Sequence, residues 1–201
     1  MAESSGSWPE QLHLRGVTEA IIATRGPNDS WNLADLGLRA PSVDERGAGR
    51  VTARTWGDTR TARVFTDRSE GIAQFVQDPR VFVDAALSVC ERDSPIHPRA
   101  YAWVELRAEL LAEGSEDGTR WVDWGLEPTE STVRDSPLPV VNRGHAAVIE
   151  ATVAVSRLGI EGYDREELLG RLQWLRSVVE RAGGSQEREA YDRLEEYASA
   201  R

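Results

Sequence analysis

Alternating apolar and polar positions predict that the amino-terminal two thirds of the chain is rich in β-strands. Over residues 17–24, odd and even positions would lie on opposite faces of a strand, which the turn-forming segment GPNDS at 26–30 ends. Residues 31–41, WNLADLGLRAP, give a second short strand. The runs at 100–114 and 119–128 predict a β-hairpin, joined by the acidic, glycine-containing segment SEDG.

A further hairpin is predicted between RVTARTW (50–56) and TRTARVF (59–65), because Gly57-Asp58 suits a two-residue loop. In this register six polar or aromatic side chains share one surface, and the opposite surface is mainly apolar. The facing pairs are Trp56 with Thr59, Arg54 with Thr61, and Thr52 with Arg63. Such a surface could bind an anion such as phosphate. The alternative is a solvated strand whose arginines pair with nearby aspartates.

Helical periodicity replaces the β-pattern in the last third of the chain. Residues 145–160 are apolar almost all round, which predicts a buried helix. Residues 163–184 begin with a capping box at Asp164 and end at a Gly-Gly pair, and Ser185 could cap a final helix. With a short helix predicted at 78–88, the fold class is α+β.

Charge and composition narrow the possible functions. The 201 residues carry 34 acidic and 24 basic side chains, a formal net charge of −10, and every basic residue is arginine. The absence of lysine excludes a Schiff base, a phosphate-loop lysine and a lysine general base. The acidic excess argues against nucleic acid as a partner, because it would repel phosphate backbones. It also suggests a halophilic source.

The chain shows no signal for secretion, membrane insertion or metal binding. Its amino terminus has neither a basic start nor an apolar run, so we expect a cytoplasmic protein. Cys90 is the single cysteine and is expected to be buried. It and the three histidines lack metal-ligand spacing. Glu19 and Glu150 interrupt apolar faces, and we expect buried ion pairs there.

A second candidate anion site is the segment NRG, residues 142–144, at the start of the helix predicted from residue 145. Free N–H groups at a helix amino terminus attract anions, and Arg143 would add a charge. The alternative is that Asn142 caps the helix and Arg143 lies in solvent.

Four segments in order resemble the mainly archaeal, flavin-like family catalogued as domain of unknown function 447. They are residues 18–38, 53–65, 78–87 and 140–158. The resemblance implies an FMN-binding split β-barrel with a carboxyl-terminal helical segment, in a protein that is a homodimer with FMN near the interface. We therefore expect a flexible tail at 1–10, a flavin-binding barrel at 11–143, and helices packed on the barrel at 144–201.

The resemblance also implies which residues contact FMN. Thr59 and Thr61, with Arg60 between them, would hold the phosphate. Arg54, on the polar surface of the predicted hairpin, is a further candidate for a contact with the cofactor. The backbone of the second strand, at Asn32, Leu33 and Ala34, would lie along the isoalloxazine ring. Asn142 and Arg143 would add a contact. The chain differs from related sequences at Asp35, where proline is common, and at Val64, where asparagine is common.

Three functions remain open at this stage. The first is an FMN-dependent oxidoreductase that passes electrons between a donor such as a nicotinamide and an unknown small substrate, the redox chemistry belonging to the flavin. The second is a non-enzymatic flavin-binding or storage protein, because no side chain stands out as an acid or base. The third is a barrel that has lost flavin and serves as a structural or interaction module, or binds another cofactor such as haem or a deazaflavin.

Overall fold

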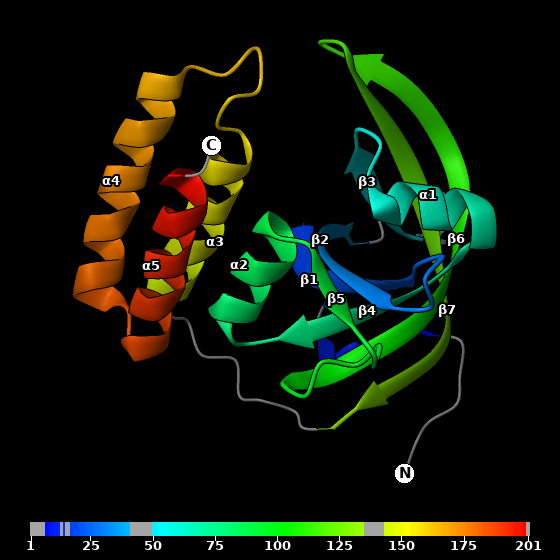
Figure 1. Cartoon of the computed structure of the whole chain (residues 1–201). Coiled ribbons are helices and arrows are strands. Elements are labelled where there is room, and N and C mark those ends of the chain that lie inside the picture. The colour runs from blue at the N-terminus through cyan, green and yellow to red at the C-terminus, as the bar shows by residue number, and fades with distance from the viewer. Residues whose placement is uncertain (1–6, 13, 15–16, 41–49, 135–142, 200–201) are drawn as a thin grey trace. The chain divides into compact units, whose positions relative to one another are not determined.

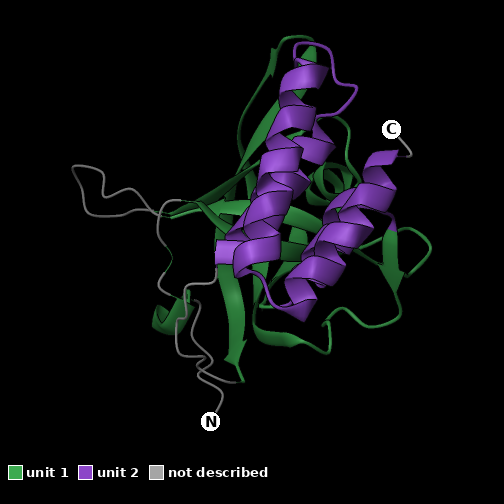
Figure 2. Ribbon diagram, turned by 90° about the vertical axis from the view of Figure 1, so that its left-hand side faces the viewer, with its two compact units in different colours: residues 1–77, 90–137 green, residues 78–89, 138–201 purple. Residues whose placement is uncertain are grey.

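The computed structural model describes residues 7–12, 14, 17–40, 50–134 and 143–199. The chain divides into two compact units, shown in Figure 2: a barrel unit of residues 1–77 and 90–137, and a helical unit of residues 78–89 and 138–201. Each unit has its own cluster of buried apolar side chains.

The barrel unit is a closed antiparallel barrel, visible in Figure 1. Strands neighbour one another in the order β1-β4-β6-β7-β3-β2, β1 also pairs with β2 to close the barrel, and β5 extends the sheet beside β2. The strands are β1 (Val17–Arg25), β2 (Trp31–Arg39), β3 (Val51–Trp56), β4 (Glu70–Val76), β5 (Cys90–Arg92), β6 (Ala100–Glu116) and β7 (Thr119–Val133). A short 3-10 helix, η1 (Glu10–Leu12), precedes β1.

Most predicted elements of this unit are confirmed. β1, β2 and β3 lie where alternation placed them, and β6 and β7 form the long hairpin. At its turn Asp117 and Gly118 both have positive φ, 49° and 77°, as the tightest hairpin loops require. β4 and β5 are not predicted, because β4 is buried at five consecutive positions and so lacks alternation, and β5 has only three residues.

The predicted strand at 59–65 is wrong: it is the helix α1 (Arg60–Arg68). Thr61, Ala62 and Phe65 are buried, a spacing that suits one face of a helix and not one face of a strand. The predicted facing pairs are therefore wrong as well. β3 pairs instead with β7, with Arg54 opposite Asp123 and Trp56 opposite Trp121.

The barrel core surrounds two aromatic side chains from distant parts of the chain. Phe65 of α1 meets Trp124 of β7 edge to face, with ring centroids 5.2 Å apart. The indole N–H of Trp124 donates a hydrogen bond of 2.9 Å to the Thr55 hydroxyl, which satisfies its polar group inside the core. Through Phe65, α1 is anchored on the barrel.

The helical unit contains α2 (Pro79–Leu87), α3 (Arg143–Ser156), α4 (Arg165–Ala182) and α5 (Ser185–Ser199). The predicted helices are confirmed, including the Asp164 cap, whose carboxylate accepts hydrogen bonds from the Glu166 and Glu167 amides. Ser185 is itself the first helical residue, and the Glu187 carboxylate instead accepts a hydrogen bond from the Gly184 amide.

Close packing explains one glycine of the helical unit. A Cβ atom built on Gly144 would lie 2.4 Å from the Gly183 Cα, so only glycine allows α3 to approach α4 there. None of the helices in the described ranges combines the length and apolar character needed to span a membrane.

Three predictions of burial are wrong. Glu19 and Glu150 are exposed, since each lies on the solvent side of its element. Glu150 does form an ion pair, with Arg171 of the neighbouring α4. Cys90 is only half-buried, because β5 lies at the edge of the sheet.

Candidate functional site

The polar residues at the amino-terminal end of α1 form the first part of the candidate site. β3 ends at Trp56, and Gly57 turns the chain with a positive φ of 70°. Thr59 then caps α1, its hydroxyl accepting a hydrogen bond of 3.1 Å from the Ala62 amide. The Arg63 amide bonds to the Thr59 carbonyl, 3.1 Å away, which starts the helical ladder.

This geometry leaves donors for a ligand. The first N–H groups of a helix have no acceptor within it, and Thr59 takes only that of Ala62, so those of Arg60 and Thr61 face outward from the helix end. The partial positive charge of the helix amino terminus favours an anion there. Thr59 and Arg60 are exposed, whereas the Thr61 side chain is only 4% exposed.

An ion pair connects α1 to the strand β5, which pairs with β2. The Arg60 guanidinium pairs with the Glu91 carboxylate on β5. Glu91 in turn lies opposite Asn32 in the pairing of β5 with β2. The structure therefore brings together Asn32 and Arg60, two of the residues singled out in the sequence, through a glutamate that the sequence does not single out.

Buried polar groups continue the site along β2. Asn32 is 8% exposed, Leu33 is buried opposite Cys90, and Ala34 is half-buried. Thr24 of β1 lies directly across from Asn32, so their side chains share one face of the sheet. The Thr24 hydroxyl is buried without a hydrogen-bond partner in the described part of the chain. A buried polar group left unpaired is a candidate contact for a bound ligand.

Arg54 is engaged elsewhere. Its guanidinium donates two hydrogen bonds of 2.7 Å to the Asp123 carboxylate, and it lies over the ring of Trp121, 4.2 Å from the centroid. These bonds hold the pKa of Asp123 below its usual range and raise the pKa of Arg54. Trp56, whose ring centroid is 5.5 Å away, completes the cluster.

The remaining predicted residues belong to the helical unit, lie at other positions of β2 and α1, or fall outside the described residues. Arg143 is the first residue of α3 in the helical unit and is exposed. Asn142 lies outside the described residues. Asp35 is exposed on β2, and Val64 is half-buried on α1, one turn beyond Arg60.

Glu91 and Thr24 are the residues that sequence reasoning misses. Glu91 lies in a strand too short to show alternation, in a chain with many other carboxylates. Thr24 reads as an ordinary strand residue, and only its unpaired buried hydroxyl distinguishes it. No sequence signal separates either residue from its neighbours.

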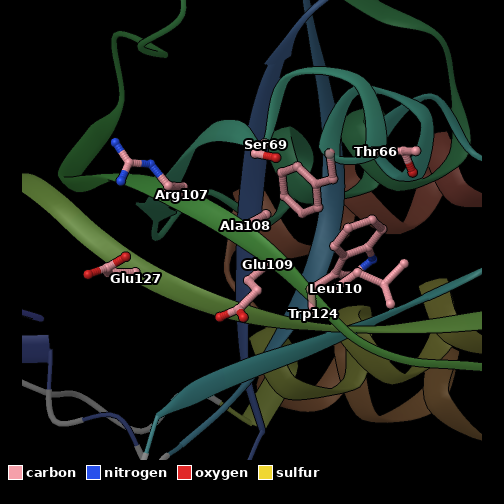
Figure 3. Close-up of a pocket in the computed structure, with 9 residues that line it drawn as sticks. Thr66, Ser69, Arg107, Ala108, Glu109, Leu110, Trp124 and Glu127 are labelled. Carbon is pink, nitrogen blue, oxygen red and sulfur yellow. The ribbon is translucent and has the colours of Figure 1, made fainter.

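Two cavities open beside the other end of α1. The first, about 440 Å³, is the Trp124 cavity, lined by Phe65, Thr66, Ser69, Arg107, Ala108, Glu109, Leu110, Trp124 and Glu127. Figure 3 shows Arg107 and Glu127 at one side of it and Thr66, Leu110 and Trp124 at the other. The second, about 450 Å³, contains Trp31 and Val64 and is described below. Neither contains Asn32, Thr59 or Thr61.

The described ranges contain no group of three or more histidine, cysteine, aspartate or glutamate side chains placed to hold a metal ion. What the site offers is an anion site at a helix terminus, next to buried polar groups of two strands. A helix terminus of this kind suits an anionic group such as a phosphate.

A family model described as the amino-terminal domain of a protein of unknown function (DUF447) matches residues 18–135, and its carboxyl-terminal counterpart matches residues 142–196. None of the curated proteins is similar in sequence to this chain.

Among solved structures, an FMN-bound DUF447 protein from Methanosarcina mazei is similar with a TM-score of 0.74 and 24% identity, over 92% of this chain and 96% of the other. The flavin reductase of styrene monooxygenase from Pseudomonas putida covers 62% of this chain and 93% of its own, with 10% identity and a TM-score of 0.42. A flavoredoxin from Methanosarcina acetivorans covers 61% and 72%, with 9% identity and a TM-score of 0.45. The last two scores are too low to carry an argument, whereas the first shows the fold.

Proposed function

Since the chain belongs to the DUF447 family of proteins of unknown function, we propose that it binds FMN in the barrel unit. The observation that carries this proposal is the amino-terminal end of α1, where Thr59, Arg60 and Thr61 present donors to an anion. That a DUF447 protein of the same fold is FMN-bound supports it.

The phosphate of FMN would lie at this helix end. The amides of Arg60 and Thr61 and the hydroxyls of Thr59 and Thr61 would donate to its oxygens, and Arg60 would exchange part of its ion pair with Glu91 for the phosphate. A dianionic phosphate suits this end because the helix dipole and a guanidinium both favour negative charge.

The isoalloxazine ring would extend along β2. Asn32 and the buried Thr24 hydroxyl would supply hydrogen bonds, while Leu33 and Ala34 would cover the ring with backbone and apolar surface. The Arg54 guanidinium is hydrogen-bonded to Asp123 and so would not contact the ligand itself. It would instead hold the Trp56 and Trp121 rings beside the site.

We further propose that the protein is an oxidoreductase. Bound FMN supplies reversible electron and hydride transfer. The chain's own part would be to orient the ring and fix its polarity, with a nicotinamide donor and a small molecule as reaction partners. A flavin store would bind FMN equally well and show no turnover of the donor.

Changes on α1 provide the test. Arg60→Gln, or Thr61→Val, should weaken FMN binding about tenfold or more, the expected cost of losing a hydrogen bond to a charged group. Arg68→Gln, two turns along the same helix, is the matched control and should leave the affinity unchanged. Fluorescence quenching of FMN measures binding, and oxidation of a nicotinamide measures turnover.

The outcomes separate the functions. A purified chain with the visible absorption of a flavin and donor oxidation above free FMN would support the oxidoreductase. Binding without turnover would leave a store. A colourless chain that does not quench FMN, or equal affinity of the Arg60 and Arg68 variants, would contradict the proposed site.

We also propose a homodimer. Thr59 and Arg60 are exposed, so the site is open on the solvent side of the barrel unit. A planar ring bound there would gain apolar cover from a second copy of the chain.

A further inference from the structure

A second cavity of the barrel unit has the features of a ligand site distinct from the FMN site. The Trp31 cavity, about 450 Å³, is lined by Arg25, Trp31, Val64, Arg68, Glu70, Gly71, Ile72, Glu105, Leu106, Arg107 and Thr129. Its residues come from the turn end of the β1–β2 hairpin, from α1, and from β4, β6 and β7. A volume of this size accommodates a small molecule of one or two rings.

The cavity has an apolar base. Gly71, Ile72 and Leu106 are buried, and Val64 is half-buried beside them. Trp31 is half-buried at the wall, and the guanidinium of Arg25 lies 6.0 Å from its ring centroid. An apolar base next to an indole ring suits a flat, apolar ligand body.

Two arginines of the cavity are available for an anion. Arg25 forms an ion pair with Asp29 at 3.3 Å, whereas no hydrogen bond or ion pair joins Arg68 or Arg107 to any other side chain in the described ranges. A guanidinium presents paired donors to a carboxylate or phosphate.

The backbone holds these two arginines close together. The Ser69 carbonyl accepts a hydrogen bond of 2.9 Å from the Ala108 amide, so Arg68 and Arg107 flank one hydrogen bond. Arg107 also lies opposite Glu70 in the pairing of β4 with β6. The two side chains therefore start from neighbouring backbone positions in the lining of one cavity.

Carboxylates complete the lining. Glu70 and Glu105 line the cavity. They would repel a purely anionic ligand but accept a hydrogen bond from a hydroxyl or ring N–H. The ligand should therefore be a flat ring that carries a carboxylate or phosphate on one side and a hydrogen-bond donor on another.

α1 relates this cavity to the proposed FMN site. Arg60, Val64 and Arg68 are spaced by four residues and so lie on one side of the helix, with Arg68 about 12 Å from Arg60 along the axis. Arg60 pairs with Glu91, and Arg68 lines the cavity. We propose that the Trp31 cavity binds an aromatic anion with a hydrogen-bond donor, as a second ligand beside the first site. Binding there does not require FMN.

The proposal is tested by titrating 6-hydroxy-2-naphthoate, the probe, into the protein and measuring the heat of binding by isothermal titration calorimetry. The chain should bind it with a dissociation constant below about 1 mM. Arg68→Gln with Arg107→Gln should weaken binding about tenfold or more. 2-Naphthol, which lacks the carboxylate, should bind to the original chain as weakly as the probe binds to the Arg68/Arg107 variant.

Matched controls keep the result specific. Arg120→Gln with Arg165→Gln removes the same charge from exposed positions outside the cavity and should leave probe binding unchanged. FMN affinity should be unchanged in the Arg68/Arg107 variant, so failure of one site is distinguishable from failure of the other. If that variant does not fold, replacing both arginines by lysine should still weaken binding, since lysine lacks the paired donors.

The proposal is overturned by any of three results. They are the absence of saturable probe binding, equal affinity of the Arg68/Arg107 variant and the original chain, and equal affinity for the probe and for 2-naphthol.

Discussion

At the residue scale, the Arg54–Asp123 pair shows how neighbouring strands assign roles to charged side chains. Arg54 reads in the sequence as part of an anion-binding surface, but β7 places a carboxylate opposite it. Both side chains are about one fifth exposed, at 22% and 23%, so the pair is shielded more than a surface ion pair. Its two hydrogen bonds make it a structural link between β3 and β7.

This pair predicts a dependence of stability on pH. The pKa of Asp123 is lowered from 3.8 by hydrogen bonds from Arg54, so the folded state binds its proton less readily than the unfolded state. The stabilisation is complete above pH 3.8 and is lost as pH falls through the lowered pKa of the folded state. Asp123→Asn should reduce the free energy of unfolding at pH 7 by about 1 kcal/mol. This reduction should become smaller as the pH falls below 3.8.

Urea unfolding between pH 7 and pH 3 measures this effect. Glu113→Gln is the matched control, because its ion pair with Arg120 at 2.6 Å is half exposed on both sides. That change should alter the free energy of unfolding by less than about 0.5 kcal/mol. A difference between Asp123→Asn and the original chain that does not change with pH would contradict the assignment.

At the element scale, α1 decides how the candidate site works. A strand over 59–65 would present Thr59, Thr61 and Arg63 on one flat face. A helix instead gathers Thr59, Arg60 and Thr61 at one end, where unpaired amides and the dipole add to the side chains. The proposed phosphate donors are therefore the amides and hydroxyls at the end of a helix, and not arginine side chains on the face of a sheet.

The role of Thr59 distinguishes the two structures directly. Valine favours strands and cannot cap a helix, so Thr59→Val should lower the free energy of unfolding by about 1 kcal/mol. Thr59→Ser retains the hydroxyl that accepts from Ala62 and should stay within about 0.5 kcal/mol. Urea unfolding without FMN measures both. A neutral or stabilising valine would favour the strand.

At the scale of the whole molecule, the two units have separate cores and the candidate site belongs to the barrel unit. The buried apolar residues of the helical unit lie on α2 to α5 and, with Leu158, just after α3, and they include Val83 of the short α2. The proposed FMN residues of the barrel unit lie on α1, β1, β2 and β3, with an open side. The proposed second copy would cover this side.

Sedimentation equilibrium checks the proposed homodimer. The chain has a mass of 22.3 kDa, and we expect about twice this mass at micromolar concentration, with FMN shifting the equilibrium further towards the dimer. The Arg68/Arg107 variant serves as a control and should keep this mass. A single-chain mass both with and without FMN would contradict the dimer.

The sequence by itself determines the elements whose stabilisation is local. Alternation locates β1, β2 and the β6–β7 hairpin, and caps and periodicity locate α3 and α4, because these signals depend on neighbouring residues. The resemblance singles out Thr59, Arg60, Thr61 and Asn32.

Only the tertiary structure decides what these residues meet. It makes 60–68 helical, with Thr61, Ala62 and Phe65 buried on one side and Phe65 packed against Trp124. It places Glu91 beside Arg60 through an ion pair between a strand and a helix, Thr24 beside Asn32 across the β1–β2 hairpin, and Asp123 beside Arg54 through the pairing of two strands far apart in the chain. Such pairings depend on closing the barrel, a property of all six strands together that no single segment encodes.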